Sequence, residues 1–284
     1  MCDEFSPFER ATTTRRGFAA LSGAAALAAR RAMARSGGGA ALSETTVSIP
    51  TPAGRADAVF IHPLHGAHPG VVMWPDIGGL RDAFRIMARR LAAAGYAVLV
   101  VNQYYRNARA PVLTSFADWM TPSGQARLRP MIAALNPPEI ASDGDAFVRW
   151  LDSQAAVDKR RGIASSGYCM GGPFALRTAA AAPARVTAVA SFHGANLVTT
   201  RPDSPHLLIA QTKARFLFAI GRNDDARAPG DKDALRAAAA AAQRPAEITV
   251  YPADHGWCVI DTPAYDPAEA DRAWDRMLAL FAQL

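Results

Sequence analysis

The segment Gly167-Tyr168-Cys169-Met170-Gly171 has the form Gly-x-nucleophile-x-Gly, with a cysteine in the nucleophile position. A predicted strand precedes it and a predicted helix follows it, so Cys169 lies on a sharp turn. Glycines at both ends let the strand and the helix approach closely. The turn also places the thiol at a helix amino terminus, where unpaired N–H groups and the helix dipole favour a thiolate. We therefore expect Cys169 to be a nucleophile, although most free cysteines are small buried hydrophobic residues.

A thiol nucleophile needs a general base and an acid that orients this base. After such a turn, the acid and then the histidine follow along the chain. Asp224 comes shortly after a predicted strand that ends at Ile220, and His255 follows the strand that ends at Tyr251. The neighbouring Asp225 is the competing acid, and the spacing from strand to acid favours Asp224. The sequence thus predicts a catalytic triad of Cys169, Asp224 and His255.

The acyl transfer that such a triad performs also needs backbone N–H donors for the developing oxyanion. Met170, directly after the nucleophile, supplies the first donor. The second is expected in the loop Pro75-Asp76-Ile77-Gly78-Gly79, which follows an earlier predicted strand. Because its two glycines allow a close approach of the backbone, we assign the second N–H to Ile77.

The elements that position these groups follow from the hydrophobic pattern. From Thr45 onward, short apolar or β-branched runs alternate with helical patterns, which predicts an α/β fold with a mostly parallel sheet covered by helices on both faces. Strands are expected over residues 46–49, 58–61, 70–74, 97–102, 162–167, 186–192, 215–220 and 248–251. Helices are expected between Gly79 and Gly95, over 140–155, 171–182 and 231–243, and at the carboxyl end.

Residues 103–138 interrupt this alternation and contain several prolines. An irregular segment of this length that follows the carboxyl end of a central strand is typical of a wall or partial lid over an active site. A packed surface excursion explains the pattern equally well.

Composition excludes several classes of protein. The net charge of +6 comes mostly from scattered arginines, without the basic stripe of a nucleic-acid surface. Apolar runs are too short for stable membrane insertion. The three cysteines, Cys2, Cys169 and Cys258, form neither a disulfide scaffold nor a metal motif. His62, His65 and His68 indicate a solvated loop rather than a metal site, and His193 indicates a strand end.

The amino terminus has the features of an export signal. Thr14-Arg15-Arg16-Gly17-Phe18 precedes a weakly apolar segment, and Ala32-Met33-Ala34 has the form of a signal-peptidase site. This pattern predicts a twin-arginine signal over residues 1–34, recognised by the twin-arginine export machinery, with a periplasmic or otherwise exported protein. An arginine-rich leader of a cytoplasmic protein is the alternative. Residues 35–44 are expected to be a flexible lead-in and 45–284 the catalytic domain.

From about residue 45 to its end, the chain resembles the dienelactone hydrolase family of α/β-hydrolases. The resemblance rests on Gly-Tyr-Cys-Met-Gly-Gly at 167–172, on Asp76 to Gly79, on Tyr104-Tyr105-Arg106, and on Asp224 and His255. It implies hydrolysis of a small ester or lactone through a thioester, with no metal or organic cofactor.

The resemblance also assigns further site residues. In this family a glutamate near the oxyanion loop pairs with the resting cysteine, and Asp76 stands in its place here. Family arginines bind the substrate carboxylate, and Arg106 matches one of them, with Tyr105 and Trp257 as further candidates for substrate contact. The arginine expected after the histidine is replaced within Gly256-Trp257-Cys258-Val259.

Two other functions remain open from the sequence. The same triad could transfer an acyl group to an alcohol or thiol instead of to water. A redox or binding protein with a hydrolase-like fold would instead pair Cys169 with Cys258, which follows His255 by three residues.

Overall fold

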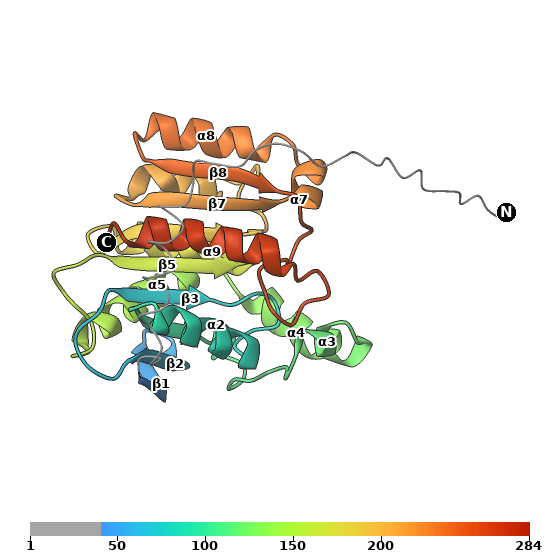
Figure 1. The fold of residues 1–284 in the computed structure, drawn as a ribbon. Helices are drawn as coiled ribbons and strands as arrows, with labels where there is room; N and C mark the ends of the chain where they lie inside the picture. Colours follow the sequence, from blue (N-terminus) through green and yellow to red (C-terminus); the bar gives the residue numbers. More distant parts are fainter. Residues whose placement is uncertain (1–40) are drawn as a thin grey trace, which may run out of the picture. The chain divides into compact units, whose positions relative to one another are not determined.

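A single eight-stranded sheet forms the centre of the computed structural model, which describes residues 41–284 (Figure 1). The strand order is β1-β2-β4-β3-β5-β6-β7-β8. The strands are β1 Leu42–Thr51, β2 Gly54–Pro63, β3 Gly70–Trp74, β4 Ala97–Val101, β5 Ile163–Tyr168, β6 Val186–Phe192, β7 Arg215–Gly221 and β8 Ala246–Tyr251. The first two strands form an antiparallel hairpin that pairs Thr51 with Gly54, and strands β3 to β8 run parallel. The predicted α/β fold is confirmed.

Helices cover both faces of this sheet. They are α2 Asp82–Ala93, α3 Phe116–Trp119, α4 Pro122–Ala134, α5 Pro137–Ser153, α6 Gly171–Ala181, α7 Arg222–Arg227, α8 Asp231–Ala241, α9 Pro267–Phe281 and the 3₁₀ helix η1 Pro205–Gln211. Apolar side chains of α2 and α9 belong to one core cluster, and those of α5, α6 and α8 belong to another. In Figure 1, α2 and α9 accordingly lie on the same side of the sheet.

Alternation along the central strands fills both of these cores. All five residues of β4 are buried. Val98 and Val100 pack in the cluster with α2 and α9, whereas Leu99 and Val101 pack in the opposite one. A strand buried on both faces needs such a continuous apolar run, which is why the sequence located β4 well.

The segment 103–138 is more regular than its prolines suggested. It contains α3 and α4, and α5 begins within it. Pro122 and Pro137 occupy first-turn positions, where a missing N–H costs no helical hydrogen bond. Thr121 and Asn136 cap these helices by accepting the N–H groups of Gly124 and Glu139. The prediction of an irregular segment was therefore wrong, because these prolines begin helices.

The strand order brings two loops of the predicted site together. β3 lies between β4 and β5, and Trp74 at its end is opposite Gly167. The loops that carry Ile77 and Cys169 therefore leave adjacent strands at the same edge of the sheet, where α/β folds bind ligands. The predicted export signal and most of the lead-in lie outside the described residues. Within residues 41–284, no helix is long and apolar enough to span a membrane.

Candidate active site

Cys169 lies on the tight turn between β5 and α6 and has a left-handed φ of 54°. A residue other than glycine rarely adopts this backbone conformation unless the surrounding structure imposes it. Here two glycines allow the close packing around the turn. A Cβ at Gly167 would collide with the Gly171 carbonyl, and a Cβ at Gly171 would collide with the carbonyl of Trp74 on β3. The glycines of the motif thus let three segments meet at the cysteine, whose side chain remains partly exposed.

His193 holds the backbone of this turn. The Cys169 N–H donates to the Phe192 carbonyl at 3.0 Å and to Nδ1 of His193 at 3.2 Å. Burial and the nearby His255 hold the pKa of His193 well below its usual value. His193 is therefore neutral and accepts at Nδ1. The sequence indicated a strand-end histidine and missed this contact, because nothing in the local pattern shows where the ring points.

Asp224 and His255 form a close pair. Nδ1 of His255 lies 2.8 Å from Oδ2 of Asp224, and the His255 backbone N–H donates to Oδ1 of Asn223 at 2.8 Å. Burial alone lowers the pKa of His255, but the hydrogen bond with Asp224 and the interaction with Cys169 outweigh it and raise the pKa to about 10. The histidine therefore carries a proton at neutral pH, between the Asp224 carboxylate and the sulfur of Cys169.

The second acid, Asp225, points to a different partner. Its two carboxylate oxygens lie 2.7 and 2.8 Å from Nζ of Lys232 on α8. Both acids are in the first turn of α7, yet they face different neighbours because successive helical residues project about 100° apart. The structure thus brings Asp224, and not Asp225, to His255.

The raised pKa of His255 predicts how protein stability depends on pH. A pKa raised from 6.5 to about 10 contributes stability that is fully present below pH 6.5 and is lost as pH rises to 10. Unfolding by urea should show wild type more stable than His255→Gln by on the order of 3 kcal/mol at pH 6. That difference should shrink at pH 10. A difference independent of pH would contradict the assigned ion pair.

In the loop after β3, two backbone N–H groups are bonded to Asp76, and the Ile77 N–H is left without an acceptor among residues 41–284. The Gly78 N–H donates to Oδ1 of Asp76 at 2.8 Å, and the Gly79 N–H donates to the Asp76 carbonyl at 3.0 Å. Within the described chain, the N–H groups of Ile77 and Met170 have no protein acceptor. They come from adjacent sheet loops, so these two N–H groups are available to an oxyanion.

The carboxylate of Asp76 is engaged by an arginine. Arg81 donates to both oxygens of Asp76, at 2.7 and 3.0 Å, and also to both oxygens of Asp261. Asp261 in turn accepts the N–H of Phe116 at 2.9 Å. Burial raises the pKa of Asp76. The sequence expected Asp76 beside the cysteine and missed this buried network, which joins the loop after β3 to the segments near α3 and α9.

The three predicted substrate contacts are engaged elsewhere. Arg106 donates to both oxygens of Asp143 on α5, at 2.6 and 3.0 Å, and the Tyr105 hydroxyl donates to Asp143 at 2.8 Å. Trp257 is fully buried, stacks on Tyr251 and packs edge-on against His193. Arg106 and Tyr105 therefore hold α5 against the loop after β4, and Trp257 packs against His193 from within the core.

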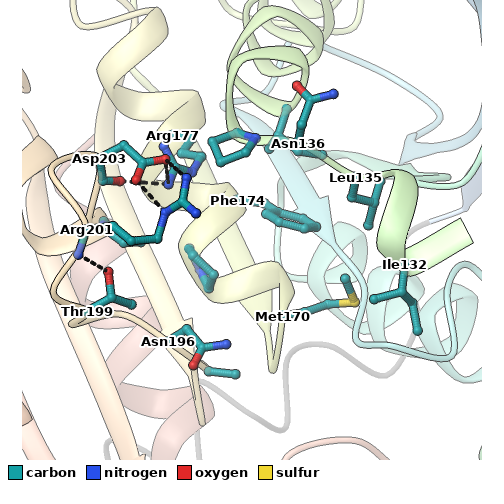
Figure 2. A pocket seen from close by; sticks show the side chains of 15 residues that line it. Ile132, Leu135, Asn136, Met170, Phe174, Arg177, Asn196, Thr199, Arg201 and Asp203 are labelled. Carbon is teal, nitrogen blue, oxygen red and sulfur yellow. Dashed lines mark hydrogen bonds and ion pairs between the residues drawn. The ribbon is translucent and has the colours of Figure 1, made fainter. Parts of the chain in front are cut away.

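A pocket of about 460 Å³ opens beside Met170 (Figure 2). Most of its walls are apolar and come from α4, α5, α6 and the loop before η1: Ile132, Leu135, Pro137, Ile140, Met170, Pro173, Phe174, Ala195 and Pro205. Arg177, Arg201 and Asp203 gather at the end away from Met170. Part of the segment 103–138 thus forms a wall of a pocket that begins at the turn between β5 and α6.

Arg177 is the most enclosed charge in this pocket. Its side chain is 11% exposed and donates to the Asp203 carbonyl at 2.8 Å, while the Asp203 carboxylate lies 3.7 Å away. Burial and the neighbouring Arg201 lower the pKa of Arg177, and Asp203 opposes them. Two guanidinium groups share one carboxylate, so this end of the pocket has a net positive charge.

The described cysteines are both free. Cys258 is buried in the core cluster with α2 and α9, and burial raises its pKa well above the usual value. The predicted alternative of a bond between Cys169 and Cys258 is not seen. Among residues 41–284, no cluster of three His, Cys, Asp or Glu side chains could hold a metal ion. His68 bonds the carbonyl groups of Gly95 and His65 instead.

Comparison with known proteins finds similar sequences and structures over most of the chain. A Salmonella typhimurium (strain LT2) protein provisionally named carboxymethylenebutenolidase is 30% identical over 249 residues, which cover 86% of this chain and 88% of the relative. The structure of a provisionally named dienelactone hydrolase from Klebsiella pneumoniae superposes with a TM-score of 0.73 and 26% identity, covering 86% of this chain and 100% of that one. A dienelactone hydrolase-like promiscuous phosphotriesterase from metagenomic libraries superposes with a TM-score of 0.69 and 23% identity, covering 86% and 99% of the two chains, and shows the same fold.

The sequence profile of the dienelactone hydrolase family matches residues 56–284, which include the turn that carries Cys169, the loop after β3 and the Asp224–His255 pair. The chain belongs to the dienelactone hydrolase family.

Proposed function

We propose that this protein hydrolyses a small carboxylic ester or lactone through a thioester on Cys169. The observation that carries the proposal is the convergence of a thiol on a strained turn, a histidine with a pKa of about 10, and an aspartate 2.8 Å from that histidine. Nucleophile, base and orienting acid in this arrangement are the parts of a covalent acyl-transfer mechanism.

The reaction divides into two balanced steps. His255 holds the proton of Cys169 while the sulfur attacks the ester carbonyl, and the Ile77 and Met170 N–H groups stabilise the oxyanion. When the ester C–O bond breaks, His255 gives this proton to the leaving alkoxide. A water molecule then attacks the thioester carbonyl and gives a proton to His255. The C–S bond breaks and releases the carboxylic acid. Asp224 stabilises the imidazolium throughout.

A direct test is to trap the covalent intermediate. The purified protein should hydrolyse activated esters such as p-nitrophenyl acetate and should show a burst of p-nitrophenol. Acid quenching followed by mass spectrometry should find the acyl group on the peptide that contains Cys169. An acyl group on another residue, or no turnover of any small ester or lactone, would refute the proposal.

The pocket beside Met170 suggests which part of the substrate it accepts. An apolar group of the ester would bury against the side chains from α4, α5 and α6, and a negatively charged end would meet Arg177. A charge-assisted hydrogen bond in such an enclosed position contributes about 1.5–3 kcal/mol. We therefore propose that the preferred esters carry an anionic group at the end of a short apolar chain.

Arg177→Met should remove this preference. Two p-nitrophenyl esters share the same four-methylene chain and differ at its end: the hexanoate ends in a methyl group and the monoester of adipic acid in a carboxylate. In wild type, kcat/KM should be about 10-fold higher for the charged ester, and in Arg177→Met the ratio should fall to about 1 or below. Arg201→Met is the matched control, because the Arg201 side chain is 71% exposed and should matter less. Equal ratios in wild type and Arg177→Met would exclude this role.

A further inference from the structure

We infer that Gln103 positions the oxyanion hole by holding the peptide group that carries the Ile77 N–H. The inference rests on the proposed function, since it assigns a task within the same acyl transfer. Nε2 of Gln103 donates to the Asp76 carbonyl at 2.7 Å. This carbonyl and the Ile77 N–H belong to one trans peptide, in which they point in opposite directions. Fixing the carbonyl on the β4 side therefore fixes the N–H on the opposite side.

The need of a buried carbonyl for a hydrogen-bond donor does not explain the contact between Gln103 and Asp76. The Asp76 carbonyl already accepts the Gly79 N–H at 3.0 Å, so it needs no second donor. Gln103 is 2% exposed, and in the described chain its Oε1 has no hydrogen-bond partner. Burying an unpartnered amide oxygen costs about 1–3 kcal/mol, which an apolar side chain would avoid. An amide nevertheless stands at this position, and its Nε2 donates to the carbonyl of the Asp76–Ile77 peptide.

The next residue acts on the next peptide. The Tyr104 hydroxyl donates to the Ile77 carbonyl at 2.8 Å and contacts Sδ of Met170 at 3.4 Å. Its ring packs against Gly79, which has a left-handed φ of 74° and leaves little room for a Cβ. Tyr104 is fully buried, and burial raises its pKa, so the hydroxyl stays a donor at any working pH.

Together, the hydrogen bonds from Gln103 and Tyr104 fix the direction of the Ile77 N–H. Of the three N–H groups in the loop at positions 77, 78 and 79, the second and third bond to Asp76. The carbonyls of Asp76 and of Ile77 accept hydrogen bonds from Gln103 and Tyr104, which follow β4, the strand paired with β3. The Ile77 N–H is therefore aimed before substrate arrives, which is the preorganisation that oxyanion stabilisation requires.

The test separates oxyanion stabilisation from the reactivity of the thiol. Gln103→Met has nearly the same shape but no donor. We expect kcat for p-nitrophenyl acetate to fall about 10- to 100-fold with KM within about 2-fold, because one oxyanion donor is worth about 10²- to 10³-fold. Alkylation of Cys169 by iodoacetamide forms no oxyanion, so its rate should stay within about 2-fold. Mass spectrometry of the Cys169 peptide measures that rate.

Controls keep the inference separate from the proposed function. Gln125→Met, an identical change at a residue that bonds Arg129 within α4, should keep wild-type kcat. Tyr104→Phe provides a second variant if Gln103→Met does not fold, and should give the same pattern with a smaller loss. An unchanged kcat in Gln103→Met, or equal losses in kcat and in alkylation, would overturn the inference. Failure of the proposed function would instead appear in wild type, as an absence of acyl-Cys169.

Discussion

Replacing Cys169 with alanine should abolish ester hydrolysis, with kcat/KM at least about 10⁴-fold below wild type. Alanine cannot form the thioester, so only the oxyanion donors and the binding pocket remain to act on the ester. The loss should appear in kcat, while the protein remains folded because the cysteine side chain is partly exposed at the turn. Initial rates with p-nitrophenyl acetate and a thermal melt measure both quantities.

Cys258→Ala is the matched control for this variant. Its thiol is buried in the core next to α2 and α9, so its removal should cost on the order of 1 kcal/mol of stability. The rate per folded molecule should stay near that of wild type. If Cys169→Ala instead kept activity within 10-fold of wild type, the nucleophile would have to be another group and the thioester mechanism would be wrong.

Replacing Asp224 with asparagine should lower kcat about 10²- to 10⁴-fold, with a smaller effect on KM. The amide keeps the shape of the carboxylate but removes the charge that stabilises imidazolium. It also offers an N–H₂ group, which favours the wrong tautomer of His255. Because interaction with Asp224 helps to raise the pKa of His255 to about 10, that pKa should fall in the variant. Histidine NMR titration of Asp224→Asn and wild type checks this.

Asp225→Asn carries the same chemical change one residue away. Asp225 bonds Lys232 rather than His255, so this variant should lose less than about 3-fold in kcat and at most about 1 kcal/mol of stability. Comparable losses of kcat in the two variants would show that the integrity of helix α7, rather than the contact of the Asp224 carboxylate with His255, determines activity.

The hydrophobic pattern of the sequence was enough to predict most of the fold, because the central strands are buried on both faces and therefore consist of apolar runs. Strands such as Gly70–Trp74 and Val186–Phe192 coincide with the predicted ranges. The errors lie where one residue type is common in two kinds of structure. Proline interrupts helices but is also common in their first turn, and Pro122 and Pro137 begin helices. The short helix at Arg222–Arg227 buries no residue, so no apolar periodicity could reveal it.

The candidate site divides in the same way. Cys169, Asp224 and His255 could be predicted because each occupies a fixed place relative to a strand. Arg106 could not be placed correctly, because its partner Asp143 is 37 residues away on α5. Arg177 and Gln103 left no signal in the sequence, since each acts through contacts that only the packed helices and strands create. Side-chain direction and long-range pairing are tertiary properties, and no short window of sequence contains them.

The separation between the pocket walls and the reacting groups has a consequence for how this enzyme could diverge. Ile132, Leu135 and Ile140 shape the pocket from α4 and α5, whereas the residues of the proposed triad lie on the turns after β5, β7 and β8. We therefore expect mutations of pocket residues on α4 to change which molecules fit while the proposed triad keeps its arrangement. A library randomised at Ile132, Leu135 and Ile140 should yield altered selectivity at preserved turnover, so these positions are a starting point for engineering new specificities.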